Sequence, residues 1–420
     1  MNKCKLGDLF YIKQGYAFKS EKYVSHSNYI LCTLANFSES NNFKFSSEKA
    51  TYYPDVFSHE FILCENDLII PLTEQVVGLF GNTAFVPKTE GFQFVLNQRV
   101  GKIIPYEEKA DKLFLHYLLS TQLVRDQIEA TASGTKQRNT SPDKIYDVTV
   151  WVPNIDQQRI IGRYLYSLEQ KCNVNNKICS ELETMAKTLY DYWFAQFDFP
   201  DENGEPYRTA GGEMVWNEQL KREIPKGWGV KNIQEVCAIV DCLHSKKPDL
   251  SFESENYYLL QLDNLVDMGL LDLSNKYYVS ANDYAAWTSK IEVRCGDLVI
   301  TNAGRVGDIA RIPKRIICGI GRNMTAIRAV NVDPIFMYYF FASSDMKAQI
   351  KSNTDTGSFF GSLNVRGIKQ LIMPIPPEES EIMNRFIDIV RPIRENLEMV
   401  ALQSQELSKL RDWLLPMLMN

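Results

Sequence analysis

Residues 161–193 read IGRYLYSLEQKCNVNNKICSELETMAKTLYDYW, and this stretch decides how the rest of the chain is interpreted. Apolar residues return at alternating steps of four and three, interrupted once by Asn175. This heptad spacing predicts a long helix that buries one stripe against another helix. At about 1.5 Å per residue it is roughly 50 Å long, well beyond an ordinary globular helix. The seam positions are Ile161, Leu165, Leu168, Cys172, Asn175, Cys179, Leu182, Ala186, Leu189 and Trp193.

The partner helix is expected in the same chain, because the pattern returns 221 residues later. The second seam carries Asn396 at the step equivalent to Asn175. A buried polar residue in such a seam costs stability but fixes register. We interpret Asn175 and Asn396 as register residues that meet across the helix pair; the alternative is that one or both are solvated near a frayed seam. The second seam is Ile382, Phe386, Ile389, Ile393, Asn396, Val400, Gln403, Leu407, Leu410 and Leu414.

The composition is that of a globular protein with two domains. A chain of 420 residues, 45% hydrophobic and 23% charged, is too long for one core. The start of the chain does not read as a signal peptide, and no apolar run is long enough to span a membrane. The chain has 9 cysteines but no Cys-x-x-Cys pair, and only 4 histidines. This composition argues against a zinc site and favours reduced thiols in a cytoplasmic protein.

The sequence outside the two seams also repeats itself. Residues 64–71 (CENDLIIP) match 294–301 (RCGDLVIT), and residues 111–128 match 333–350. The period of about 222 residues is far too long for a solenoid and indicates a tandem duplication. Each copy has short β-rich runs separated by Gly, Pro, Asn and Asp, then an amphipathic helix and a short apolar strand. A proline then precedes the long helix.

We therefore predict an α+β protein in which two similar mixed α/β domains are separated by two long antiparallel helices, related by a pseudo-two-fold axis. The first domain is expected at residues 1–153 and its long helix at 154–197. A segment rich in Gly, Pro and acid, residues 198–228, is expected to link the copies. The second domain is expected at 229–376 and its long helix at 377–420.

This order of domains, with the linker string FDFPDENGEPY…GGEMVWNEQLKREIPKGW and the closing KLRDWLLPMLMN, resembles the specificity subunit of type I restriction–modification systems. The resemblance covers essentially the whole chain. It implies a non-catalytic protein with two target-recognition domains. It also implies methyltransferase subunits, most simply two, docked on the helices, and restriction subunits in a full complex. No cofactor is expected on this chain: S-adenosylmethionine would serve the methyltransferase subunits, and ATP and Mg the full complex.

Two similar domains at opposite ends of a helical rod would face double-stranded DNA in opposite senses. This predicts a split target, in which two short sequences are separated by bases that are not read. The helix pair would set the spacer length. With base pairs about 3.4 Å apart, a rod of roughly 50 Å corresponds to on the order of 10 to 15 base pairs.

Candidate DNA contacts are long polar side chains near turn glycines. Arg, Asn and Gln read base edges, while Lys, Arg, Ser and Thr bind phosphates. The net charge of −6 argues against nucleic acid, but screening limits the reach of charges to about 10 Å, so a local basic patch can still bind phosphate. The alternative for each residue is an ordinary solvated side chain. The candidates are Gln75, Gln98, Arg99, Lys136, Gln137, Arg138 and Asn139 in the first domain, and Arg305, Arg311, Lys314, Arg315, Arg322, Asn323, Ser362 and Asn364 in the second.

The long helices also carry aromatic residues outside the seam or at its edge: Tyr164, Tyr190, Tyr192 and Trp413. Such residues suit a docking surface for partner helices, although a merely solvated face is the simpler interpretation.

Two other classes of function compete with DNA recognition. One is a self-contained adenine methyltransferase or nuclease, and the other is a coiled-coil scaffold with no DNA role. The methyltransferase would need a [DN]-P-P-[YF] loop and a glycine-rich cofactor turn, and the nuclease would need clustered carboxylates. The sequence has none of these patterns, and a scaffold has no reason to diversify between its repeated segments. We therefore expect neither catalytic residues nor a metal site on this chain.

Overall fold

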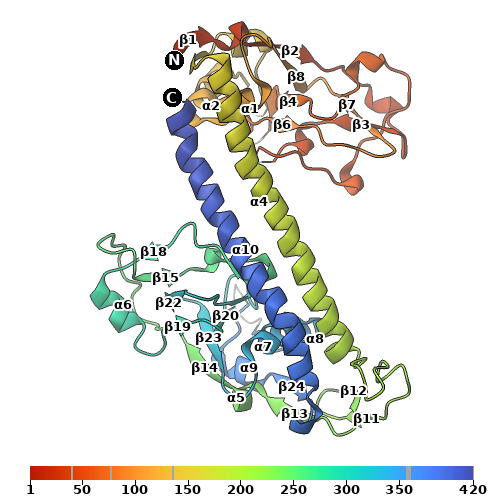
Figure 1. Ribbon diagram of the computed structural model, residues 1–420, viewed down its shortest axis with the longest axis vertical. Helices are drawn as coiled ribbons and strands as arrows, with labels where there is room; N and C mark the ends of the chain where they lie inside the picture. The colour runs from red at the N-terminus through yellow and green to blue at the C-terminus, as the bar shows by residue number, and fades with distance from the viewer. Residues whose placement is uncertain (39–40, 76–77, 135–136, 356–360, 420) are drawn as a thin grey trace. The chain divides into compact units, whose positions relative to one another are not determined.

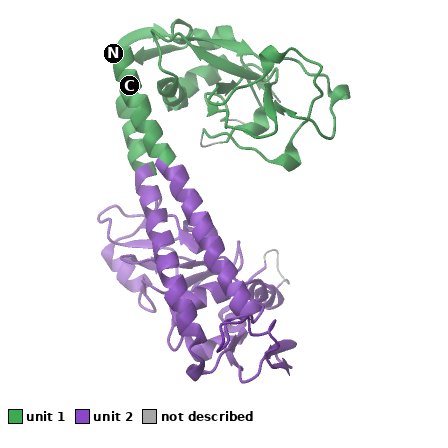
Figure 2. Cartoon of the chain, turned by 45° about the vertical axis from the view of Figure 1, so that its right-hand side comes forward, with its two compact units in different colours: residues 1–170, 408–420 green, residues 171–407 purple. Residues whose placement is uncertain are grey.

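The computed structural model describes residues 1–38, 41–75, 78–134, 137–355 and 361–419. The chain forms two compact units (Figure 2): unit 1 is residues 1–170 with 408–420, and unit 2 is residues 171–407. Each unit contains one mixed α/β domain and a part of both long helices. Within the described ranges, no helix has the length and apolar character needed to cross a membrane.

The domain of unit 1 is built on an antiparallel sheet with the strand order β2-β8-β4-β6 (Figure 1). Separate pairs are formed by β1 with β10, by β3 with β7 in parallel, and by β5 with β9. The strands are β1 Asn2–Lys5, β2 Phe10–Gln14, β3 Tyr29–Cys32, β4 Leu68–Pro71, β5 Thr73–Glu74, β6 Ala84–Phe85, β7 Gln93–Leu96, β8 Val100–Pro105, β9 Arg138–Asn139 and β10 Thr149–Val152.

The continuous apolar run of β4 follows from burial on both faces of the sheet. Leu68 and Ile70 enter the core beneath α1 (Lys112–Ser120) and α2 (Gln122–Thr131), whereas Ile69 enters a second core with β3 and β7. The carboxylate of Asp111 accepts a hydrogen bond from the backbone N of Phe114 at 3.0 Å and so fixes the start of α1. A short helix, α3 (Pro142–Tyr146), precedes β10.

The domain of unit 2 repeats this topology. Its main sheet has the order β14-β23-β20-β21, β15 pairs in parallel with β22, and β13 pairs with β24. The predicted duplication of a mixed α/β domain is therefore confirmed. The strands are β13 Gly229–Asn232, β14 Cys237–Asp241, β15 Tyr258–Leu260, β16 Leu265–Val266, β17 Leu270–Leu271, β18 Tyr277–Tyr278, β19 Val293–Arg294, β20 Leu298–Thr301, β21 Ile309–Arg311, β22 Ile317–Ile320, β23 Met324–Ala329 and β24 Ile372–Ile375. The helices are α5 Ile233–Val236, α6 Ala281–Trp287, α7 Pro334–Ala342, α8 Ser344–Ser352 and α9 Val365–Gln370.

The two long helices are α4 (Ile155–Tyr190), which continues into a π-helical turn at Asp191–Ala195, and α10 (Ile382–Met419). In unit 2 they run antiparallel, as predicted. The Cys172 thiol lies 3.7 Å from the carbonyl oxygen of Ser404, and the Cys179 thiol lies 3.6 Å from that of Leu397. Residue numbers therefore rise along one helix as they fall along the other.

The seam predicted for α4 is confirmed, because all of its residues are buried or half-buried. The seam predicted for α10 is wrong in its middle part: Ile389 is 47% exposed and Leu410 is 38% exposed. The buried stripe instead includes Val390, Arg394 and Leu397, one residue further along. A pattern that accepts only apolar residues cannot find a stripe whose centre is a fully buried arginine.

The predicted contact between Asn175 and Asn396 is also wrong. Asn175 is buried, and its Nδ2 donates to Oε1 of Gln403 at 3.3 Å, whereas Asn396 is exposed. Gln403 lies seven residues beyond Asn396, about two helical turns. The two asparagines hold equivalent positions in the two seams, but they do not lie opposite each other in the antiparallel helix pair.

The segment expected to link the two copies is packed rather than extended. Strand β11 (Met214–Asn217) pairs with β12 (Arg222–Pro225) in a hairpin. Phe199 stacks on Trp228 with ring centres 5.5 Å apart, and both belong to the core that includes Trp193 of the π-helical turn. Phe199 and Trp228 thus anchor the two ends of this segment in the core of unit 2, while most residues between them are exposed.

Candidate nucleic-acid interface

Three loops meet at one end of the main sheet of unit 1. The backbone N of Leu72 donates to the carbonyl oxygen of Arg99 at 2.9 Å, and the backbone N of Thr140 donates to that of Leu72 at 3.0 Å. The Thr73 hydroxyl donates to Oδ1 of Asn139 at 2.8 Å. These bonds join the loop after β4, the turn between β7 and β8, and β9.

We call this region the first loop edge and define it by Gln75, Gln98, Arg99, Gln137 and Asn139. The structure thus brings together two groups that the sequence analysis proposed, one from residues 136–139 and one made of Gln75, Gln98 and Arg99. Gln75, Gln98, Arg99 and Asn139 are exposed, and Gln137 donates from Nε2 to Oδ1 of Asn139 at 3.2 Å. Lys136 lies outside the described residues.

Arg138 differs from its neighbours on β9 because its guanidinium turns into the domain. Its Nη1 lies 3.0 Å from Oε1 of Glu74, a carboxylate that is 1% exposed, and its Cζ lies 5.6 Å from the ring centre of Phe80. Glu74 also accepts hydrogen bonds from the backbone N of Leu79 at 3.0 Å and of Phe80 at 3.2 Å. The predicted DNA contact at Arg138 is therefore replaced by a structural role, which is to neutralise the carboxylate that orders residues 78–80.

Tyr16 is a neighbour of the first loop edge that sequence reasoning missed. The backbone N of Gln98 donates to its carbonyl oxygen at 2.9 Å, and the side chain is 46% exposed. Its ring also packs against Phe18, 5.1 Å away between ring centres. In the sequence, such a tyrosine cannot be separated from the aromatic residues of the core.

Unit 2 has an equivalent second loop edge, defined by Asn302, Arg322, Asn323 and Ser362. The backbone N of Asn302 donates to the carbonyl oxygen of Asn323 at 2.7 Å, and the backbone N of Leu363 donates to that of Asn302 at 2.8 Å. These bonds correspond to the two bonds of Leu72 in unit 1. Asn302 was missed because its match in the first domain is the apolar Leu72.

Positive charge gathers beside Arg322. Its Nη2 donates to the carbonyl oxygen of Ser245 at 2.5 Å, and its charge lies near Lys247. Burial, together with the charge of Arg322, lowers the pKa of Lys247. A phosphate would relieve this repulsion. Sequence analysis missed Lys247, although the Lys246-Lys247 pair was a usable signal.

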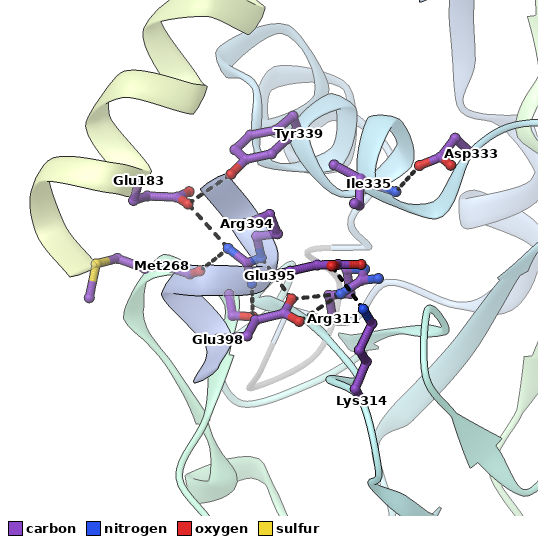
Figure 3. Close-up of polar contacts among 11 residues, drawn as sticks. Glu183, Met268, Arg311, Lys314, Asp333, Ile335, Tyr339, Arg394, Glu395 and Glu398 are labelled. Carbon is purple, nitrogen blue, oxygen red and sulfur yellow. Dashed lines mark hydrogen bonds and ion pairs between the residues drawn. The ribbon is translucent and has the colours of Figure 1, made fainter. Parts of the chain in front are cut away.

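The basic cluster predicted between residues 300 and 330 does not form a single patch. Arg311 is 4% exposed and donates to both carboxylate oxygens of Glu398, at 2.8 and 2.7 Å (Figure 3). Lys314 lies 2.8 Å from Oε2 of Glu395. Arg311 was proposed as a DNA contact, and its burial against Glu398 of α10, a partner that no local pattern could have identified, contradicts this. Lys314 stays a prediction, because its side chain is 65% exposed beside Glu395.

Two other predicted DNA contacts, Arg305 and Asn364, also have hydrogen-bond partners within unit 2. Arg305 lies 3.1 Å from Oδ2 of Asp308 and donates to the carbonyl oxygen of Leu265 at 2.6 Å. Asn364 caps α9, accepting a hydrogen bond from the backbone N of Gly367 at 2.8 Å. Arg315 is exposed but lies beside Glu395 in a groove along α10, away from the residues of the second loop edge. In unit 2 the site thus narrows to the second loop edge and Lys247.

Comparison with known proteins agrees with a DNA-recognition role. The family described as "Type I restriction modification DNA specificity domain" matches residues 1–184. The MjaIX specificity subunit of Methanocaldococcus jannaschii is 23% identical over 328 residues, covering 77% of this chain and 71% of that protein. The EcoBI specificity subunit of Escherichia coli is 21% identical over 384 residues, covering 89% and 76%. The chain is thus similar to type I restriction–modification specificity subunits over most of its length.

A solved structure agrees in fold. The type I restriction–modification S subunit from M. genitalium aligns with a TM-score of 0.64 at 16% identity, covering 100% of this chain and 96% of that one. These relatives are specificity subunits, the DNA sequence-recognition components of type I restriction–modification systems. The two loop edges are the parts of each domain that combine exposed polar side chains with a repeated backbone frame.

Proposed function

We propose that this specificity subunit reads a split DNA site, with one half contacted by the first loop edge and the other half by the second. Residues 1–153 and 229–376 act as the two target-recognition domains. The observation that carries this proposal is the repeated backbone frame, in which Leu72 and Asn302 make the same two hydrogen bonds in their own domains. The side chains mounted on the two frames differ, as two different half-sites require.

The long helices set the number of unread base pairs between the half-sites. Support comes from their length, since α4 and α10 contain 36 and 38 residues, and from their antiparallel pairing in unit 2. A paired helix is far stiffer than a loop, so it holds a spacing that a flexible connection would not.

The helices also dock partner subunits, with two methyltransferase subunits as the expected number and restriction subunits in the larger complex. Exposed aromatic side chains support this: Tyr164 is 49% exposed, Tyr192 38% and Trp413 61%. Tyr190, which was predicted to belong to this surface, is buried in the core of unit 2 instead. S-adenosylmethionine, ATP and Mg would be bound by these partners.

The chain itself performs no catalysis in this proposal. Within the described residues one group of three possible metal ligands comes together, formed by Asp241, Cys242 and His244. His244 Nε2 is already hydrogen-bonded to Oδ2 of Asp241 at 2.8 Å, and burial raises the pKa of the Cys242 thiol. A protonated thiol is a poor metal ligand, so the prediction of no metal site is retained.

The test is a selection from random duplexes by the purified chain, alone and with its methyltransferase subunits. Enrichment of two fixed sequences separated by a fixed number of random bases is expected. Methyl transfer from S-adenosylmethionine by the chain alone would support the enzyme alternative. If the chain neither enriches a split motif nor transfers methyl groups, the result would favour the alternative of a coiled-coil scaffold without a DNA role.

A further inference from the structure

A buried ionic cluster lies where both long helices meet the domain of unit 2 (Figure 3). Arg394 of α10 is 0% exposed. Its Nη1 donates to Oε2 of Glu183 on α4 at 3.1 Å, and its Nε donates to Oε1 of Glu398 at 2.9 Å. Glu398 in turn binds Arg311 of β21. We call Glu183, Arg311, Arg394 and Glu398 the Arg394 cluster; its two positive and two negative charges cancel.

The domain supplies further partners for Arg394. Its guanidinium donates to the carbonyl oxygens of Met268 and Gly269, both at 2.7 Å, and its Cζ lies 3.9 Å from the ring centre of Tyr338. Met268 and Gly269 have φ angles of 61° and 60°, a left-handed backbone that turns both carbonyls toward the guanidinium. A β-carbon at Gly269 would lie 2.1 Å from the Tyr338 ring, so glycine is required there.

Glu183 is held by α7 as well as by Arg394. Tyr338 and Tyr339 donate to its two carboxylate oxygens at 3.0 and 3.2 Å. Burial alone would lower the pKa of Arg394, but Tyr338, Glu398 and Glu183 raise it above its ordinary value. Arg394 therefore keeps its charge, and each member of the cluster has specific partners.

Unit 1 contains the same tyrosine contact. Tyr117 of α1, which matches Tyr339 in the repeat, donates to Oε2 of Glu169 on α4 at 2.6 Å. Glu169 is 7% exposed. Each domain thus places an equivalent tyrosine on a buried glutamate of α4.

We propose that the Arg394 cluster, and not an asparagine pair, fixes the register of α10 against α4 and seats the second domain on both helices. Many seam contacts between the helices are apolar and can be exchanged after a slide of one heptad. The cluster cannot be exchanged in this way. Such a slide would place Arg394 opposite Asn176 or Tyr190 in place of Glu183, and would leave buried charges without partners.

The consequence for spacer length rests on the proposed function, but the register itself can be measured without DNA. Cys172 and Cys179 lie one heptad apart on α4, and Cys172 faces Ser404. Ser404 is 8% exposed and its hydroxyl has no hydrogen-bond partner among the described residues, so Ser404→Cys is a mild change. After mild oxidation, a disulfide from position 404 to Cys172 reports the native register, and one to Cys179 reports a slide of one heptad.

The test variant carries Ser404→Cys and neutralises the whole cluster with Glu183→Gln, Arg311→Met, Arg394→Met and Glu398→Gln. Peptide mapping is expected to find both disulfides at comparable abundance, whereas the Ser404→Cys chain alone gives only the one to Cys172. In complex with its methyltransferase subunits, the neutralised variant is expected to select duplexes with several spacer lengths. The matched control is Asp297→Asn with Arg328→Met, which removes an ion pair of 2.5 Å inside the same domain and is expected to keep one register.

A neutralised variant that folds, forms only the disulfide to Cys172 and selects one spacer length would overturn the proposal. If circular dichroism shows that this variant is unfolded, Arg394→Lys decides instead, because lysine keeps the charge but loses the forked geometry. It is expected to give a detectable disulfide to Cys179, and its absence would equally overturn the proposal. Two registers with a single spacer length would support the register role but contradict spacer setting in the proposed function.

Discussion

At the scale of single residues, the arginines of this chain fall into two groups. Arg99 is exposed on a loop edge, whereas Arg138, Arg311 and Arg394 neutralise buried carboxylates. The sequence alone could not separate the two groups, because the carboxylate that pairs with each buried arginine can lie far away along the chain. Arg311 and Glu398 are 87 residues apart, and Arg394 and Glu183 are 211 apart.

Arg99→Ala is expected to relax sequence preference in one half-site only. Losing a guanidinium that contacts a base edge costs about 1–3 kcal/mol of discrimination at that base. Duplex selection with the variant measures this directly. Arg138→Ala is the matched control and should lower thermal stability without changing the selected sequence; relaxation of both half-sites by Arg99→Ala would contradict the assignment.

Glu398→Gln and Glu395→Gln provide a paired stability test on one helix. Glu398 is 4% exposed, and its neutralisation leaves Arg311 and Arg394 short of a buried counter-charge, which is expected to cost about 3–5 kcal/mol in the free energy of unfolding. Glu395 pairs with Lys314, which is 65% exposed, and its loss should cost under about 1 kcal/mol. Urea denaturation measures both values, and equal costs would refute the distinction.

Glu169 makes the stability of unit 1 depend on pH. Burial alone would raise its pKa, but His116, Tyr117 and Arg411 together lower it below the ordinary 4.5. A lowered carboxyl pKa contributes stability that is complete above the unfolded value and is lost as pH falls through the folded value. The difference in unfolding free energy between the native chain and Glu169→Gln should be full at about pH 7 and shrink steadily below the ordinary value. A difference that grows on acidification would contradict this.

At the scale of elements, the strands could be predicted better than the pairing of the helices. The runs Leu68–Ile70 and Leu298–Ile300 are apolar throughout because their strands are buried on both faces, and this signal is local. The register of α4 and α10 depends on which side chains face each other across the pair. A buried arginine at the centre of the stripe shifted the predicted seam of α10 by one residue.

Removing one heptad from both helices should shorten the DNA spacer and leave the half-sites unchanged. Deleting residues 171–177 with 400–406 removes Asn175 together with its partner Gln403 and keeps the Arg394 cluster. Seven residues correspond to about 10 Å, or about 3 base pairs. Duplex selection measures the spacer. Deletion from α4 alone is the control: it breaks the pairing and should lower the melting temperature. An unchanged spacer after the double deletion would contradict spacer setting.

At the scale of the whole molecule, the repeated strand order was predicted from matched segments, and the structure confirms it. The residues of the first loop edge were proposed from the sequence, but their meeting at one end of the sheet was not predicted. The second was predicted only in part: Arg322, Asn323 and Ser362 were proposed, whereas Asn302 and Lys247, which follows β14, were not. These residues were not predicted because their contacts are with residues far away in the sequence.

Two recognition domains on one chain should bind a split DNA site far more tightly than either domain alone. Removing one half-site from the duplex is expected to weaken binding by roughly 100-fold to 10,000-fold, because the second contact is then no longer intramolecular. Lengthening the spacer by about 5 base pairs should have a similar effect, since half a helical turn moves one half-site to the opposite side of DNA. Fluorescence anisotropy of the complex with methyltransferase subunits measures both, and tight binding to either altered duplex would contradict two-site reading.

The tyrosine that each domain places on a glutamate of α4 has an evolutionary consequence. Tyr117 and Tyr339 belong to the helices that seat the domains, while Arg99 and Asn323 lie on loops that make no part of that seat. Genetic recombination that replaces the loops but preserves the tyrosine can therefore generate new combinations of targets without rebuilding the attachment.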